Sequence, residues 1–148
     1  MGFGWAKPVP VNPLAFRHPR KGLLLVSLAG PASNVALAFV AGMLLRLAAG
    51  PVPQTGQGSP LVVILVSIVL INLFLAFFNL IPIPPLDGGG VVSAILPLEY
   101  AQKYERLSRF GTLLILGLIV AGSFSGVNVI GLVIGPPTSL LFRLFTGL

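Results

Sequence analysis

The sequence contains no cysteine, which excludes thiolate metal ligands, disulfide bonds and cysteine nucleophiles. Charge is also scarce: 8% of the 148 residues are charged, against about 25% in ordinary soluble domains. One histidine and three acidic residues leave few groups that could hold a metal ion. What is abundant is apolar sequence, with 55% hydrophobic residues and a mean hydropathy of +1.02. This composition indicates a membrane protein, and the length allows a single domain of three or four spanning helices.

The net charge of +6 does not indicate nucleic-acid binding, because the basic residues lie at the ends of apolar segments and not on one polar face. Basic residues precede the first apolar segment and follow the second, whereas residues 50–60 carry no charge. By the positive-inside rule, we expect the N-terminal arm and residues 82–110 to be cytoplasmic and residues 50–60 to lie outside. Arg46, near the outer end of its segment, can extend its guanidinium to the interface.

The apolar pattern predicts an all-α, multi-pass transmembrane bundle in one membrane-embedded domain. Prolines make part of the N-terminal arm extended, because each proline removes a backbone donor and biases its predecessor away from helix. The predicted order is an arm (1–21), two spans (22–49 and 61–81), a cytoplasmic amphipathic segment after a helix break (82–110), a span or broken helix (111–135) and a tail that begins at Pro136-Pro137 (136–148).

Small and polar residues interrupt both predicted spans. In the first, Gly30-Pro31-Ala32-Ser33-Asn34 predicts a kink, a face that allows close helix approach and, at Asn34, a packing hydrogen bond. In the second, Asn72 is a lone polar residue for which we expect an interhelical hydrogen bond, with a substrate or backbone contact as the alternative.

The second span leads into Asn79-Leu80-Ile81-Pro82-Ile83-Pro84-Pro85-Leu86-Asp87-Gly88-Gly89-Gly90. An unpaired carboxylate at membrane depth costs several kcal/mol or more, so Asp87 is a candidate functional group. Metal ligation would explain it, and so would capping of a short helix over residues 88–96; the two roles are compatible. The prolines are expected to break the helix and turn Asp87 inward, or else to contact a substrate.

Taken together and in this order, these motifs resemble the site-2 protease family of intramembrane zinc metalloproteases (peptidase M50 type). The resemblance includes the segment Gly4 to Pro13 and covers the chain from residue 2 to about 96. It implies hydrolysis of transmembrane protein substrates in the lipid bilayer, with Asp87 as a zinc ligand. It also implies that Asn79 lies near the substrate cleft. We add Pro82 and Pro84 as candidate substrate-binding residues, and we expect structural roles for Gly30, Pro31, Asn34, Gly88 and Gly89.

In that family, the other two zinc ligands and the general base come from a His-Glu-x-x-His helix, which this sequence lacks. His18 lies in a basic stretch that disfavours a cation, and neither Glu99 nor Glu105 has a histidine at the required spacing. No catalytic residue is therefore assigned. We expect an N-terminally shortened member that is inactive as an isolated chain.

The alternative is a non-catalytic pseudoprotease or a membrane scaffold that binds transmembrane partners. A transporter is disfavoured because the sequence shows no paired repeats. We expect a multi-pass protein of a prokaryotic cell membrane. Neither the substrate nor the oligomeric state is indicated by the sequence.

Overall fold

The computed structural model describes residues 18–49, 59–126 and 128–147. The predicted N-terminal arm up to residue 17 and most of the predicted outer loop lie outside the described residues. The described chain forms five helices and no strand, which confirms the all-α fold. They are α1 (Pro19–Ala49), α2 (Pro60–Asn79), α3 (Asp87–Ile95), α4 (Leu98–Ser125) and α5 (Val129–Thr146).

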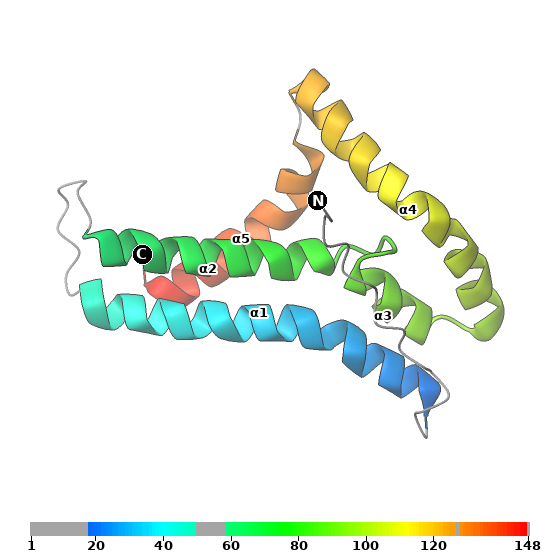
Figure 1. Ribbon diagram of the computed structural model, residues 1–148, viewed down its shortest axis with the longest axis horizontal. Helices are drawn as coiled ribbons and strands as arrows, with labels where there is room; N and C mark the ends of the chain where they lie inside the picture. Colours follow the sequence, from blue (N-terminus) through cyan, green and yellow to red (C-terminus); the bar gives the residue numbers. More distant parts are fainter. Residues whose placement is uncertain (1–17, 50–58, 127, 148) are drawn as a thin grey trace, which may run out of the picture.

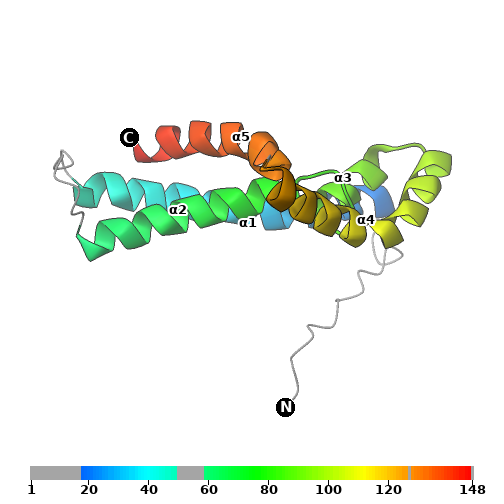
Figure 2. The same cartoon turned by 90° about the horizontal axis from the view of Figure 1, so that it is seen from above.

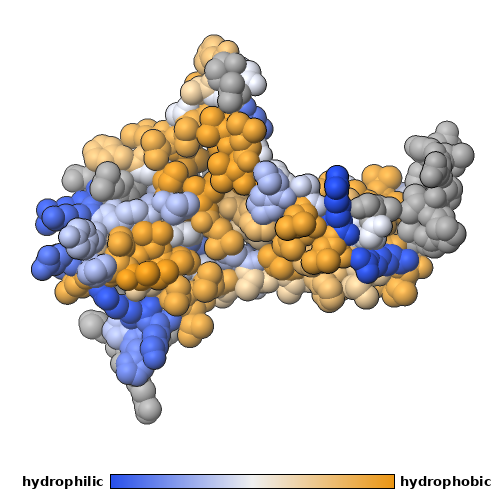
Figure 3. Space-filling view, turned by 180° about the vertical axis from the view of Figure 1, so that it is seen from behind, coloured by the Kyte–Doolittle hydropathy of each residue, from blue (hydrophilic) through white to orange (hydrophobic). Residues whose placement is uncertain are grey.

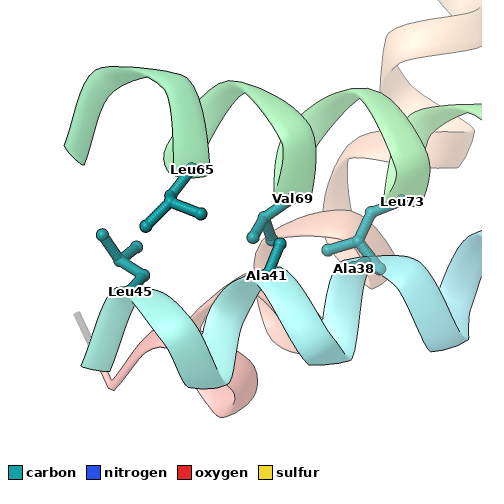
Figure 4. Close-up of a cluster of buried hydrophobic side chains, with 6 residues drawn as sticks. All are labelled: Ala38, Ala41, Leu45, Leu65, Val69 and Leu73. Atoms are coloured by element: carbon teal, nitrogen blue, oxygen red, sulfur yellow. The ribbon is translucent and has the colours of Figure 1, made fainter. Parts of the chain in front are cut away.

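Helices α1 and α2 lie side by side along the long axis of the molecule and run in opposite directions (Figure 1). Small residues of α1 face larger apolar side chains of α2 across this contact, which brings the two helices close together. The buried cluster comprises Ala38, Ala41 and Leu45 from α1 and Leu65, Val69 and Leu73 from α2 (Figure 4).

Helix α5 packs against this pair on one side, as the view from above shows (Figure 2). Near its C-terminal end, the Phe145 ring meets the Phe39 ring edge-on at 5.3 Å between centroids. A Cβ built on Gly42 would lie only 2.8 Å from the Cβ of Phe145, so this glycine permits the close approach. The guanidinium of Arg46 donates to the carbonyl of Leu144. Arg46 therefore fixes the end of α5, a role beyond the interfacial extension expected from the sequence.

Within the described part of the chain, three helices are long and apolar enough to cross a membrane: Pro19–Ala48, Pro60–Asn79 and Val129–Thr146. Helix α4 adds a fourth candidate span if its two parts, Leu98–Arg106 and Phe110–Phe124, count as one, although they meet at 59°. Together these helices make the chain an integral membrane protein with several candidate spans.

The predicted C-terminal tail is wrong, because Pro136 and Pro137 lie inside α5 and do not end it. The helix begins after Asn128, whose side chain accepts from the Gly131 N–H at 2.8 Å, and it continues to Thr146. Proline is tolerated in membrane helices where neighbouring groups can satisfy the freed backbone. The predicted segment 111–135 is accordingly divided between α4 and α5.

The interhelical hydrogen bond expected of Asn72 is also not observed. Its side-chain amide donates instead to the carbonyl of Ile68, one turn earlier in the same helix, at 2.8 Å. An apolar environment favours this bond because the alternative is an unpaired amide.

Candidate site around Asp87

The break between α2 and α3 positions the candidate site. After Asn79, the chain forms a compact turn in which the Ile83 N–H donates to the Ile81 carbonyl at 2.7 Å and the Leu86 N–H donates to the Ile83 carbonyl at 3.0 Å. The Pro84–Pro85 peptide bond is cis. Helix α3 begins directly after this turn, so the predicted helix break is present, and its prolines separate two helices.

Gly88 and Gly89 allow the first turn of α3 to pack onto the preceding turn. A Cβ built on Gly88 would lie 2.3 Å from the carbonyl oxygen of Leu80, and one built on Gly89 would lie 2.7 Å from the backbone nitrogen of Pro84. Both separations are too short for a side chain, and both glycines are buried. The two glycines therefore hold the start of α3, and Asp87 with it, against the turn.

Helix α3 also packs against α1, through two further glycines. A Cβ on Gly90 would lie 2.1 Å from Ser27 Oγ, and a Cβ on Gly30 would lie 2.9 Å from Asp87 Oδ2. The structure thus brings the two sequence motifs together, with the carboxylate of the second lying on the glycine of the first. Pro31, the next residue of the first motif, is buried.

Asp87 does not cap α3 as the alternative prediction had it. It is the first helical residue, Leu86 occupies the N-cap position, and no side-chain capping hydrogen bond forms. The carboxylate is half-buried, and burial raises the pKa of Asp87 above its ordinary value. Within the described part of the chain, no residue donates a hydrogen bond to it or pairs with it as a cation. Asp87 is a partly desolvated acid placed by tight packing.

The described residues do not by themselves fit a zinc ion. Among residues 18–49, 59–126 and 128–147, no three His, Asp or Glu side chains gather into a possible metal site. His18 is exposed just before α1, and Glu99 and Glu105 are exposed on α4. Since a catalytic zinc usually takes three protein ligands, Asp87 provides at most one of them here.

The predicted substrate-binding residues surround the helix break. Asn79 is half-buried at the end of α2, Pro82 is exposed, and Pro84 is half-buried. The Pro82 carbonyl accepts a hydrogen bond from the Tyr104 hydroxyl at 2.8 Å. A Cβ on Gly111 would lie 1.5 Å from the Pro84 carbonyl oxygen. Part of the turn's backbone is therefore covered by α4 and is not free to pair with another strand.

Tyr104 and Gly111 were missed as site residues when only the sequence was considered. Tyr104 lies in the predicted amphipathic segment and Gly111 directly after it, and neither belongs to a motif of the sequence. Their spacing of seven residues would put both on one face of a straight helix, but α4 bends by 59° between them, so the spacing did not indicate their shared contact. Asn34 is half-buried, and its expected packing hydrogen bond is not formed with any described residue.

Comparison with known proteins adds an independent observation. Residues 48–122 match the family described as "Peptidase family M50". The chain is 39% identical over 121 residues to "Putative zinc metalloprotease YwhC" of Bacillus subtilis, covering 80% of this chain and 55% of that protein. It is 31% identical over 126 residues to "Zinc metalloprotease MJ0392" of Methanocaldococcus jannaschii, covering 82% of this chain and 35% of that protein. The chain thus spans about half the length of the first relative and about a third of the second. No solved structure matches the chain significantly.

Proposed function

The chain belongs to peptidase family M50, the site-2 protease family, and on that basis we propose that it acts in an intramembrane zinc metalloendopeptidase in which Asp87 is one zinc ligand. The observation that carries the proposal is the contact between the two motifs. Four glycines remove the side chains that would separate α3 from α1 and from the preceding turn: Gly30, Gly88, Gly89 and Gly90. This packing fixes a carboxylate that has no partner among the described residues.

The remaining ligands and the general base would come from residues that this sequence does not contain. Peptide hydrolysis at a zinc site needs a full ligand set and a group that accepts the proton of the attacking water. The single histidine and the two exposed glutamates do not meet that requirement. We therefore propose that the isolated 148-residue chain does not hydrolyse peptides.

The proposed substrate is a membrane-spanning protein segment. A helical segment hides its carbonyls in intrahelical hydrogen bonds, so it must unwind before one of its peptide bonds can be attacked. The helix break beside Asn79 and Pro82 lies where an unwound segment could reach Asp87. The Pro-rich stretch 7–13, which is outside the described residues, is the proposed edge for pairing with such a strand.

The charge distribution supports a proposed orientation. Basic residues flank the N-terminal end of α1 and the first part of α4, so these ends would face the cytoplasm. The helix break and Asp87 would then lie toward the cytoplasmic side of a prokaryotic cell membrane.

The proposal is tested on the protein encoded by the whole open reading frame that contains these residues. Zinc content by elemental analysis and cleavage of a transmembrane substrate would be measured for the unaltered protein, for Asp87→Ala and for Glu99→Ala. We expect the first variant to lose both zinc and cleavage, while Glu99→Ala, an exposed acid on α4, keeps both. Full zinc binding by Asp87→Ala would contradict the assignment.

A pseudoprotease or a membrane scaffold is the second candidate. It is favoured by an exposed face of small residues on α1, which includes Ala29, Ser33 and Ala36 and suits a partner helix. The same experiment separates a scaffold from a protease. A scaffold would bind no zinc and cleave no substrate, even as the protein encoded by the whole open reading frame.

A further inference from the structure

A cavity of about 260 Å³ lies between the C-terminal half of α2 and α5, and Asp87 is not among the residues that line it. Its walls are almost entirely apolar. The α2 side is formed by Leu70 and Phe74, and the α5 side includes Gly131, Ile134, Gly135 and Phe142.

The cavity is open because α5 presents small residues to it. A Cβ built on Gly135 would meet no atom within 4 Å, so the space beside this glycine is not filled by a neighbouring side chain. An α-helix, about 10 Å across with its side chains, is too wide to enter a space of this volume. A slender apolar chain fits better.

Two polar groups lie along this cavity on successive turns of α5. The Thr138 Oγ1 atom is buried and has no hydrogen-bond partner among the described residues. Five residues later, Arg143 lines the end of the cavity, and its guanidinium forms no bond with another described side chain or carbonyl. Arg46 at the same end is different, because it is engaged by the Leu144 carbonyl.

The surface around this cavity is likewise divided into an apolar middle and hydrophilic ends. Seen from the α5 side, the molecule is covered by apolar residues over the middle of its long axis, and the strongly hydrophilic side chains lie toward its two ends (Figure 3). Arg143 belongs to the last turn of α5, a candidate span. A cation at the end of a span beside an apolar cavity combines the two features of a phospholipid, a charged headgroup and an apolar tail.

We propose that this cavity binds one acyl chain of an anionic phospholipid, with the lipid phosphate paired to Arg143 and an ester carbonyl accepting from the Thr138 hydroxyl. The acyl chain would fill the space beside Leu70, Phe74 and Gly135. If this space stayed empty, the residues that line it would lose dispersion contacts. The phosphate supplies the partner that Arg143 lacks within the described chain. The site is separate from the proposed zinc ligand and does not depend on protease activity.

Native mass spectrometry of the purified 148-residue chain in detergent tests the proposal. The probes are phosphatidylglycerol and phosphatidylcholine with identical acyl chains. We expect phosphatidylglycerol to bind about fivefold more tightly, the effect of roughly one favourable cation near a headgroup. Arg143→Gln should remove this preference. Lys21→Gln, which deletes an exposed charge at the far end of α1, should keep it.

A second pair of variants tests the cavity itself. Gly135→Leu should fill it and lower the binding of both lipids, whereas Gly117→Leu, at an open position of α4, should not. If Gly135→Leu does not fold, as judged by circular dichroism and gel filtration, Gly135→Ala provides the milder change with a partial loss. Equal binding of the two lipids by the unaltered chain, or unchanged binding by the filled variant, would overturn the proposal. Displacement of the lipid by inorganic phosphate would overturn it too, because that result indicates a simple anion site.

Discussion

Asp87 lies directly over Gly30: a Cβ built on Gly30 would come within 2.9 Å of the Asp87 Oδ2 atom. The two residues are far apart in the sequence and belong to different helices, α1 and α3. Any side chain at position 30 would have to move the carboxylate, so the glycine sets where the acid points.

Replacement of Gly30 by alanine should therefore affect metal binding more than folding. The carboxylate is the end of a short side chain and can rotate away, so we expect little loss of thermal stability. We expect the zinc affinity of the protein encoded by the whole open reading frame to fall by roughly tenfold. This is the lower end of the effect of removing a group that orients a metal ligand. Gly117→Ala is the matched control, since its Cβ would meet nothing within 4 Å. Unchanged zinc affinity in the Gly30 variant would show that the carboxylate position is not set by this contact.

Replacement of Gly88 by alanine should destabilise the protein. Here the Cβ would meet the backbone carbonyls of Leu80 and Ile81 at 2.3 and 2.4 Å, and backbone cannot move as a side chain can. We expect a loss of about 1–3 kcal/mol, the usual cost of overpacking. The measurement is unfolding in detergent followed by circular dichroism. Gly117→Ala again serves as the control, because alanine in an open helical position is favoured by about 1 kcal/mol over glycine. Equal stability of the two variants would contradict the packing described for the start of α3.

Removal of the Tyr104 hydroxyl should loosen α4 from the turn that precedes Asp87. Tyr104→Phe loses the hydrogen bond to the Pro82 carbonyl, which is worth about 0.5–1.5 kcal/mol. Tyr100→Phe is the control, because Tyr100 contacts Lys103 through its ring, with the ammonium 5.8 Å from the centroid. Hydrogen exchange of the amides in residues 80–86 should rise in the first variant only.

The pH dependence of stability should carry the signature of Asp87. Its pKa in the folded chain is raised by burial above the ordinary value of 3.8, so folding favours the protonated carboxyl. The ionised carboxylate therefore destabilises the folded state. This destabilisation is absent below the ordinary pKa of 3.8, grows as pH rises from there, and is complete above the raised pKa of the folded state. In metal-free protein, Asp87→Asn should therefore become more stable than the unaltered chain as pH increases toward 7. The difference in unfolding temperature measured across this range checks the sign; a difference that shrinks with rising pH would show that the folded state stabilises the ionised form.

The sequence predicted the features that depend on local chemistry. The helix break after Asn79 follows from three prolines, which lack backbone N–H donors. The all-α fold follows from the long apolar runs, because in lipid a helix is the form in which a single segment makes all of its own backbone hydrogen bonds. The closeness of the first motif and Asp87 was not predicted and is a finding of the structure.

Other features depend on tertiary structure and could not be predicted in this way. The contact between Tyr104 and Pro82 requires the direction that the bent α4 takes. The error at Pro136 has a different origin: proline reliably ends helices in water, where a freed carbonyl can bind solvent, but it is tolerated in a span. For Asn72 the structure shows the backbone contact that was the alternative to an interhelical bond, because one turn of helix already offers its amide an acceptor.

The consecutive prolines inside α5 have a mechanical consequence. Neither Pro136 nor Pro137 has an N–H group, so the carbonyls of Leu132 and Val133 have no helical donor, and two adjacent rungs of the helix ladder are missing. The residues beyond them are held to the neighbouring helices by Phe145 and by Arg46. The middle of α5 is therefore held in place by side-chain packing, with Ile134 buried, and not by a continuous ladder of backbone hydrogen bonds.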